Sequence, residues 1–114
     1  FDASMSLRNR ERWIKNSQPQ GRIAIDEGAL AAIRERHSLL PRGLRSCEGR
    51  FDRGAVILVT SEGSREGAAK VVTGLSSEEI ERVIGLRSEE VEGVLGPGSP
   101  KIIARPEETV FLED

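Results

Sequence analysis

Short apolar runs separated by polar, glycine-containing breaks dominate the chain, and this pattern predicts several short strands. Residues 55–60, AVILVT, are the most apolar run, and they are bounded by Gly54 and by the turn sequence SEGS. A short β-branched run of this kind is typical of a strand buried on both faces. Residues 21–25, GRIAI, alternate and place two isoleucines on one face of another strand. Residues 65–74, REGAAKVVTG, follow SEGS and are predicted to pair with 55–60 as a hairpin.

Two helices are predicted in the first third of the chain. Residues 6–16, SLRNRERWIKN, are rich in helix formers and carry an apolar pair seven residues apart. Residues 27–36, EGALAAIRER, follow Asp26, whose carboxylate can accept hydrogen bonds from the free amides of the first helical turn. We expect Leu30 and Ile33 of this second helix to face the core.

Two short glutamate-rich helices are predicted in the second half. Ser76 and Glu79 have the spacing of a capping box, which favours a helix over 77–85. A second helix is predicted over 88–96, and each of the two ends at a glycine. The glutamates crowd the first turn of both helices, where they complement the helix dipole.

The end of the chain predicts a turn and two more strands. The turn is GPGSP at 96–100, and the strands are KIIA at 101–104 and TVFL at 109–112. Strands therefore outnumber regular strand–helix–strand units. This order favours an α+β fold with a small mixed barrel or sheet over a doubly wound sheet.

Charge is distributed unevenly along the 114 residues, although the net charge is only −2. Residues 1–58 carry 11 basic and 7 acidic side chains, and residues 59–114 carry 6 basic and 12 acidic ones. A basic face could therefore attract a polyanion, although charged helices are more often simply solvated. No apolar run approaches the roughly 20 residues that cross a bilayer, and the first residues lack the apolar core of a signal peptide. We expect a cytoplasmic protein without a membrane partner.

The residues that could carry chemistry are few. His37 and Cys47 are the lone histidine and cysteine, too few ligands for a zinc site and too far apart in sequence to indicate a nucleophilic pair. Cys47 has no partner for an internal disulfide, so we expect a buried, reduced thiol. The GPGSP turn follows a helix and lacks a lysine, unlike a phosphate-binding loop. These patterns indicate neither a catalytic nor a metal-binding residue in this segment.

One long segment resembles a known family. Residues 25–54, IDEGALAAIRERHSLLPRGLRSCEGRFDRG, are similar to the signature of the PUA domain, in particular the PUA domain at the C-terminus of bacterial glutamate 5-kinase. RNRERWI at 8–14 and the glutamate-rich segment at 68–96 extend the resemblance. It implies a PUA-like mixed β pseudo-barrel with short flanking helices over residues 19–114. Residues 1–18 would be a linker and helix that follow an amino-acid kinase domain.

The resemblance also gives residues 41–54 a structural role. Pro41 and Gly43 would turn the chain, because proline fixes one torsion and glycine accepts conformations that other residues avoid. Residues 44–48 would form a strand, and Phe51 would fill the barrel core. Residues 52–54, Asp-Arg-Gly, would form a hairpin into the strand at 55–60.

The resemblance implies a function for a longer parent enzyme. That enzyme would transfer phosphate from ATP, with magnesium, to the side-chain carboxylate of L-glutamate in the first step of proline biosynthesis, giving L-glutamyl 5-phosphate. The catalytic residues would lie in the kinase domain, so this segment would have neither catalytic residues nor a cofactor. Its expected role is regulation or assembly of a homo-oligomer, with Trp13 and its helix contacting the kinase domain.

The alternative is binding of structured RNA, which other PUA domains perform. The family's RNA-binding positions would correspond to five basic residues: Arg34, Arg36, Arg42, Arg45 and Lys70. The planar fork of arginine suits this work because it can hold a phosphate in two places. Three departures from the family pattern, Val71, Leu75 and Ala55, weaken the RNA-binding hypothesis more than the fold.

Overall fold

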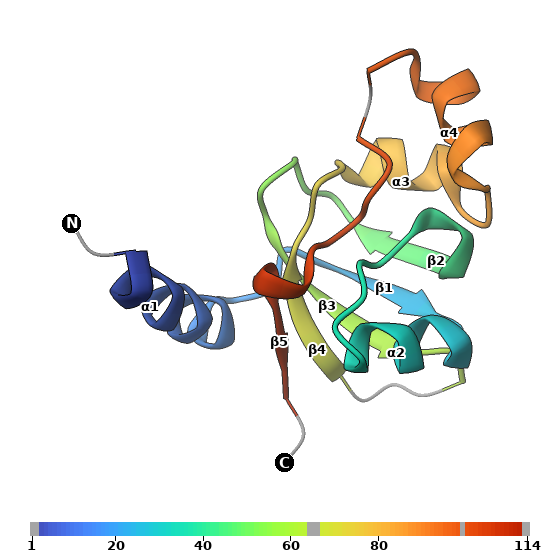
Figure 1. The fold of residues 1–114 in the computed structure, drawn as a ribbon. Coiled ribbons are helices and arrows are strands. Elements are labelled where there is room, and N and C mark those ends of the chain that lie inside the picture. The colour runs from blue at the N-terminus through green and yellow to red at the C-terminus, as the bar shows by residue number, and fades with distance from the viewer. Residues whose placement is uncertain (1–2, 64–66, 99, 113–114) are drawn as a thin grey trace.

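The computed structural model describes residues 3–63, 67–98 and 100–112, with side chains from residue 9 onward. In this part of the chain five strands form one sheet, in the order β2-β1-β3-β4-β5 (Figure 1). The strands are β1 (Gly21–Ile25), β2 (Leu44–Gly49), β3 (Val56–Ser61), β4 (Gly67–Val72) and β5 (Thr109–Phe111). The predicted turns 61–64 and 96–100, the hairpin segment 65–74 and the segment 1–18 each include residues outside the described ones.

Helices lie on both sides of the sheet. Figure 1 shows α1 beside β5, and α3 with α4 on the opposite side beside β2. The helices are α1 (Ala3–Asn16), α2 (Glu27–Arg34), α3 (Ser77–Val83) and α4 (Ser88–Leu95), and the short 3₁₀ turns are η1 (Pro41–Gly43) and η2 (Pro106–Glu108). All four predicted helices are confirmed, with α2 and α3 each two residues shorter than expected. α2 ends early because Arg36 has a φ of 70°, which a helix cannot continue through.

β3 is the central strand of the sheet. It pairs in parallel with β1 and antiparallel with β4, so the predicted hairpin of β3 and β4 is confirmed. Its two faces are buried as expected, since Val56, Ile57, Val59 and Thr60 are at most 4% exposed.

The expected hairpin at residues 52–54 is wrong. The chain does turn there, and the Ala55 amide donates to the Asp52 carbonyl at 3.2 Å. However, β2 pairs with β1 in antiparallel fashion, and β1 lies between β2 and β3 in the sheet. The turn therefore joins two strands that are not neighbours, a relation that the local sequence of a turn does not reveal.

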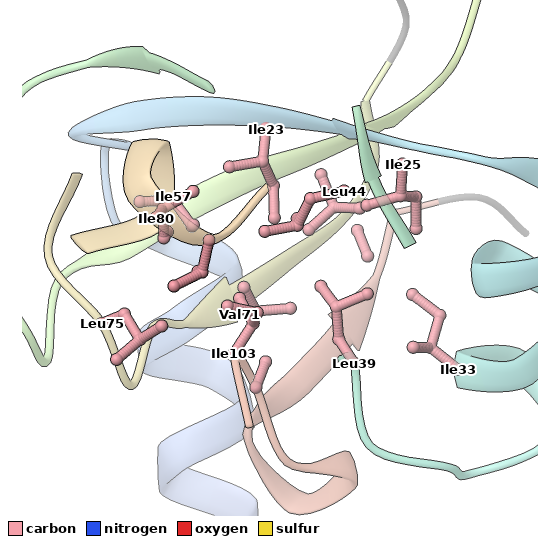
Figure 2. Close-up of a cluster of buried hydrophobic side chains, with 14 of the residues drawn as sticks. Ile23, Ile25, Ile33, Leu39, Leu44, Ile57, Val71, Leu75, Ile80 and Ile103 are labelled. Carbon is pink, nitrogen blue, oxygen red and sulfur yellow. The ribbon is translucent and has the colours of Figure 1, made fainter. Parts of the chain in front are cut away.

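The core lies on the inner face of the sheet, under α2 and α3 (Figure 2). Ile23 and Ile25 of β1 point into it, as their alternation predicts. Phe51 is 6% exposed and packs so close to Gly21 that a Cβ there would lie 2.5 Å from the ring. The scaffold role expected for Phe51 is confirmed.

The expected strand at 101–104 is wrong. The amide of Leu39 donates to the Ala104 carbonyl at 2.9 Å, and the amide of Ile103 donates to the Leu39 carbonyl at 2.8 Å. The Ile103 carbonyl accepts from Gly74 at 2.7 Å. Ile103 and Ala104 are buried as the apolar run predicts. Their partners lie in loops rather than strands, so only an isolated bridge forms.

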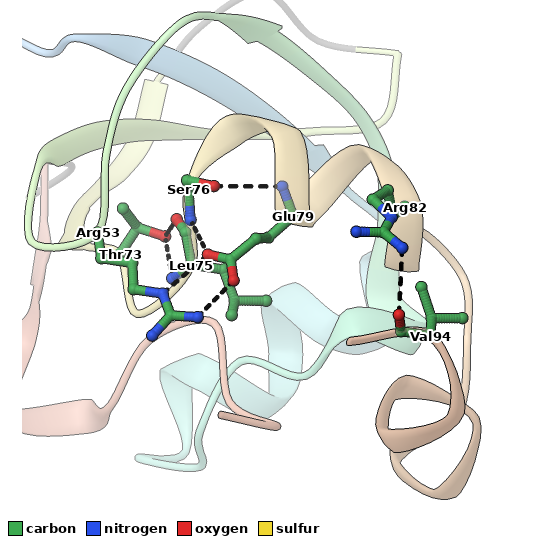
Figure 3. A network of polar contacts seen from close by, with 7 residues as sticks. All are labelled: Arg53, Thr73, Leu75, Ser76, Glu79, Arg82 and Val94. Atoms are coloured by element: carbon green, nitrogen blue, oxygen red, sulfur yellow. Dashed lines mark hydrogen bonds and ion pairs between the residues drawn. The ribbon is translucent and has the colours of Figure 1, made fainter. Parts of the chain in front are cut away.

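A polar network fixes the start of α3 (Figure 3). Ser76 Oγ accepts from the Glu79 amide at 3.3 Å, and Glu79 Oε1 accepts from the Ser76 amide at 2.9 Å, which confirms the capping box. Arg53 Nε donates to Glu79 Oε1 at 2.8 Å and its Nη2 contacts Oε2. This ion pair ties the 52–54 turn to α3, and it lowers the pKa of Glu79 to about 2, chiefly through the hydrogen bond from Arg53.

Candidate nucleic-acid interface

One aspartate organises the segment from α2 to β2. Asp26 is the N-cap of α2, and its Oδ1 accepts a hydrogen bond from the Ala29 amide at 2.7 Å, as predicted. Its Oδ2 accepts one from Arg45 Nη2 at 3.0 Å, and its amide donates to the Gly43 carbonyl at 3.0 Å. Asp26 therefore joins α2, η1 and the start of β2.

A cavity of about 480 Å³ lies between α2 and the loop that leads into η1. Its lining includes Ala29 and Ala32 from α2, and Leu39, Leu40 and Arg42 from the loop and η1. An apolar wall beside one guanidinium can receive a flat ring while the cation meets a phosphate. Sequence reasoning missed this cavity because the path of a loop, rather than a periodic pattern, forms it.

Three of the four candidate arginines belong to the same continuous segment. Arg34 is the last residue of α2, Arg36 follows it in the left-handed conformation, and Arg42 lies in η1. All three are exposed. The structure thus places these three arginines on the segment that borders the cavity, and Arg42 lines the cavity itself.

Arg45 is engaged with neighbouring acids. Besides its contact with Asp26, its Nε lies 3.7 Å from Glu62 Oε2. Its side chain is 45% exposed. Two carboxylates therefore offset its charge, and a phosphate would have to compete with both of them.

Lys70 lies apart from the four arginines. It is on β4, and β1 and β3 separate that strand from β2, which carries Arg45. At the usual strand spacing this is about 14 Å. Its Nζ donates to the carbonyls of Lys15 at 2.9 Å and Ser17 at 2.8 Å, where α1 ends. A lone charge in the apolar run GAAKVV predicts an outward-facing strand position, but the contact with α1 has no signal in the sequence.

The environment of Cys47 disfavours nucleophilic chemistry. The thiol is free and half-buried in β2, so the expectation of a buried thiol holds only in part. Burial, followed by the charges of Glu81 and Glu48, raises its pKa to about 11. The thiol is therefore protonated at neutral pH. Among the described residues, no three histidine, cysteine or carboxylate side chains gather as metal ligands would.

A known domain family matches most of this chain. The family model of the PUA domain matches residues 21–95, more than half of the chain. The chain belongs to the PUA domain family. The PUA domain also resembles the crystal structure of a PUA domain from Aeropyrum pernix K1, a tartrate complex, with a TM-score of 0.55 and 21% identity, covering 75% of this chain and 41% of that one. This likeness shows the α+β fold alone.

The sequences that the PUA domain resembles more strongly are those of glutamate 5-kinases. It is 45% identical over 85 residues to the enzymes of Citrobacter koseri and Salmonella arizonae, covering 73% of this chain and 23% of each relative. It is 44% identical over 89 residues to the enzyme of Escherichia coli, covering 68% of this chain and 24% of the relative. The chain thus spans about a quarter of the length of these relatives.

Two of the departures from the PUA pattern lie in the core. Val71 and Leu75 are 0% exposed. Ala55 is partly buried and packs against the same core. In this PUA domain, Val71 and Leu75 therefore adjust internal packing instead of adding bulk to a surface that RNA would approach.

In the described part of the chain no helix is long and apolar enough to span a membrane.

Proposed function

We propose that this chain is the PUA domain of a glutamate 5-kinase and serves that enzyme as a non-catalytic regulatory or assembly module. The observation that carries the proposal is the 45% identity over 85 residues with glutamate 5-kinases. This identity is about twice the 21% that the chain shares with the PUA domain from Aeropyrum pernix, a likeness that shows the fold alone.

The parent enzyme would phosphorylate L-glutamate with ATP and magnesium in the first step of proline biosynthesis, in the cytoplasm and as a homo-oligomer. Segment 1–18 would connect this domain to the kinase domain. The charged pairs support a module without catalysis, since Asp26 caps α2 and binds Arg45, and Glu79 completes the capping box of α3 and binds Arg53. Both carboxylates therefore have structural roles in the fold.

We expect Trp13 to contact the kinase domain. Its side chain is 54% exposed on α1, an unusual position for the largest apolar side chain in the sequence. Indole rings are frequent anchors of protein interfaces because they bury a large area with few rotatable bonds.

The test uses the full-length protein that contains this chain. Glutamate-dependent ADP formation, its inhibition by proline, and the mass in solution are compared for the intact protein, a version without this domain, and Trp13→Ala. Leu40→Ala is the matched control, because Leu40 is the other large apolar residue that is exposed among those described, at 38%. We expect truncation and Trp13→Ala to change the proline response or the mass, and Leu40→Ala to change neither.

Two results would contradict this function separately. A full-length protein without glutamate-dependent ATP turnover would overturn the parent identity. Intact turnover with no effect of truncation or of Trp13→Ala would overturn the regulatory or assembly role.

A second candidate is RNA binding, which the exposed arginines beside the cavity favour. Arg36 and Arg42 are exposed, and Arg42 lines the cavity. With total tRNA as the probe, Arg36→Gln together with Arg42→Gln should weaken binding and lower its dependence on salt. Fewer phosphate contacts form in this variant, so fewer counterions are released on binding. Arg105→Gln, an exposed arginine near β5, is the control. Equal binding by all variants would exclude this interface.

A further inference from the structure

The end of α1 is attached to the sheet by a side chain that is distant in sequence. Lys70 Nζ donates hydrogen bonds to the carbonyls of Lys15 at 2.9 Å and Ser17 at 2.8 Å. The last carbonyls of a helix have no partner within the helix, and they form the negative end of its dipole. Lys15 lies in the last turn of α1 and Ser17 directly follows the helix, so the Lys70 ammonium provides hydrogen bonds and an opposite charge at this end of α1.

The sheet holds Lys70 in position for this contact. Register places Leu58 of β3 on one side of Lys70 and Val110 of β5 on the other, so apolar neighbours support its aliphatic stem. Lys70 is only partly exposed. Because Ala69 and Val71 point into the core, alternation places Lys70 on the opposite, outer face of the sheet.

Additional contacts join α1 to the same face. Ile14 is 0% exposed, although it is not a member of the main core, and α1 contacts β4, β5 and η2. Ser17 Oγ donates to the Trp13 carbonyl at 2.6 Å, which closes the last turn of the helix. The Gln20 amide then donates to the Val56 carbonyl at 2.9 Å, so the segment after α1 is bound to β3 as well.

We propose that Lys70 is a positioning residue that clamps α1 onto the outer face of β4, so that α1 and the sheet move as one body. The same contact withdraws Lys70 from nucleic-acid binding, because the carbonyls of Lys15 and Ser17 use two of its three N–H donors. A further step rests on the proposed function: the clamp fixes the direction in which Trp13 meets the kinase domain.

The experiment compares Lys70→Met with Lys101→Met in the 114-residue chain. Methionine keeps the unbranched stem and removes the donors, and Lys101 is an exposed lysine whose Nζ lies 2.9 Å from Glu92 Oε2 on another part of the surface. Trp13 is the single tryptophan, so its fluorescence anisotropy reports on α1 alone. Amide hydrogen exchange is measured along the whole chain, and Lys70→Arg tests rescue by another cation.

We expect Lys70→Met to lower the anisotropy of Trp13 and to speed exchange of the amides of residues 9–16 by about tenfold or more, with β1 and β3 unchanged. Lys101→Met should behave as the wild type. Lys70→Arg should give values between those of Lys70→Met and the wild type. If Lys70→Met matches the control, or if the whole sheet exchanges faster, Lys70 does not clamp α1. A loss of tRNA binding in Lys70→Met equal to that of the Arg36/Arg42 variant would also overturn the proposal. A clamp confirmed by exchange, in a full-length enzyme indifferent to Lys70→Met, would instead count against the proposed function alone.

Discussion

The contact between Gly43 and Ala29 gives a sharp test of how η1 is seated on α2. A Cβ on Gly43 would lie 2.5 Å from the Ala29 Cβ but 3.7 Å from the Ala29 Cα. The first distance is about 1 Å shorter than an ordinary carbon–carbon contact, and the second is normal. Gly43 does not have a positive φ, so alanine is compatible with its backbone. The whole conflict is therefore between two methyl groups.

The magnitudes follow from that geometry. Gly43→Ala overpacks a buried site and should lower the free energy of unfolding by about 2 kcal/mol. Ala29→Gly removes the facing methyl and should cost about 1 kcal/mol of helix stability. Two independent changes would together cost about 3 kcal/mol. Because glycine at position 29 removes the clash, we expect the double variant to lose only about 1 kcal/mol, a coupling of about 2 kcal/mol.

Urea unfolding followed by circular dichroism measures all four proteins of this cycle. The free energies are comparable only if the slopes with urea agree, which also checks that no variant changes the two-state transition. An additive double variant, or a Gly43→Ala variant as stable as the wild type, would show that η1 is not seated against α2 as described.

Three further predictions concern Phe51, Cys47 and Glu79. Phe51→Ala should lower the free energy of unfolding by about 3–4 kcal/mol, because Phe51 is buried. Trp13→Ala should lower it by less than about 0.5 kcal/mol, because Trp13 is exposed. Similar losses for the two variants in urea unfolding would contradict the placement of Phe51 in the core. Iodoacetamide should modify native Cys47 at pH 8 about a hundredfold more slowly than the urea-unfolded chain, because a rise in pKa from 9.0 to about 11 removes most of the thiolate, and equal rates would refute it. The pKa of Glu79 is lowered from 4.5 to about 2, so the stability that its charge contributes is present above about pH 4.5 and is lost as pH falls toward 2. The urea midpoint of Glu79→Gln should therefore lie below that of the wild type at pH 7 and approach it near pH 2, while a constant difference would exclude the ion pair as the cause.

Local chemistry made much of this fold predictable. The caps at Asp26 and Ser76 and the apolar run of β3 depend on neighbours in sequence, and all three were predicted correctly. The errors at 52–54 and 101–104 share one cause. Whether an extended segment becomes a paired strand depends on which distant segment lies beside it, and no local pattern carries that information.

The candidate site was less predictable than the fold. Basic residues near α2 can be read from the sequence, but their partners cannot. Arg45 meets Glu62 and Lys70 meets α1 across separations that composition does not reveal. The resemblance to a family indicates which basic residues to consider, and the tertiary structure shows that Arg42 lines the cavity, whereas Lys70 contacts the end of α1.

The parallel pairing of β1 with β3 has a consequence for how this domain folds. Ile23 lies opposite Val59, whereas the hairpin of β3 and β4 pairs residues much nearer in sequence, such as Val59 and Ala69. Closing a longer loop costs more chain entropy before any contact compensates for it. We therefore expect the hairpin of β3 and β4 to form first. Docking of β1 beside β3 should then limit the folding rate, because the chain between these two strands must be ordered before they can pair.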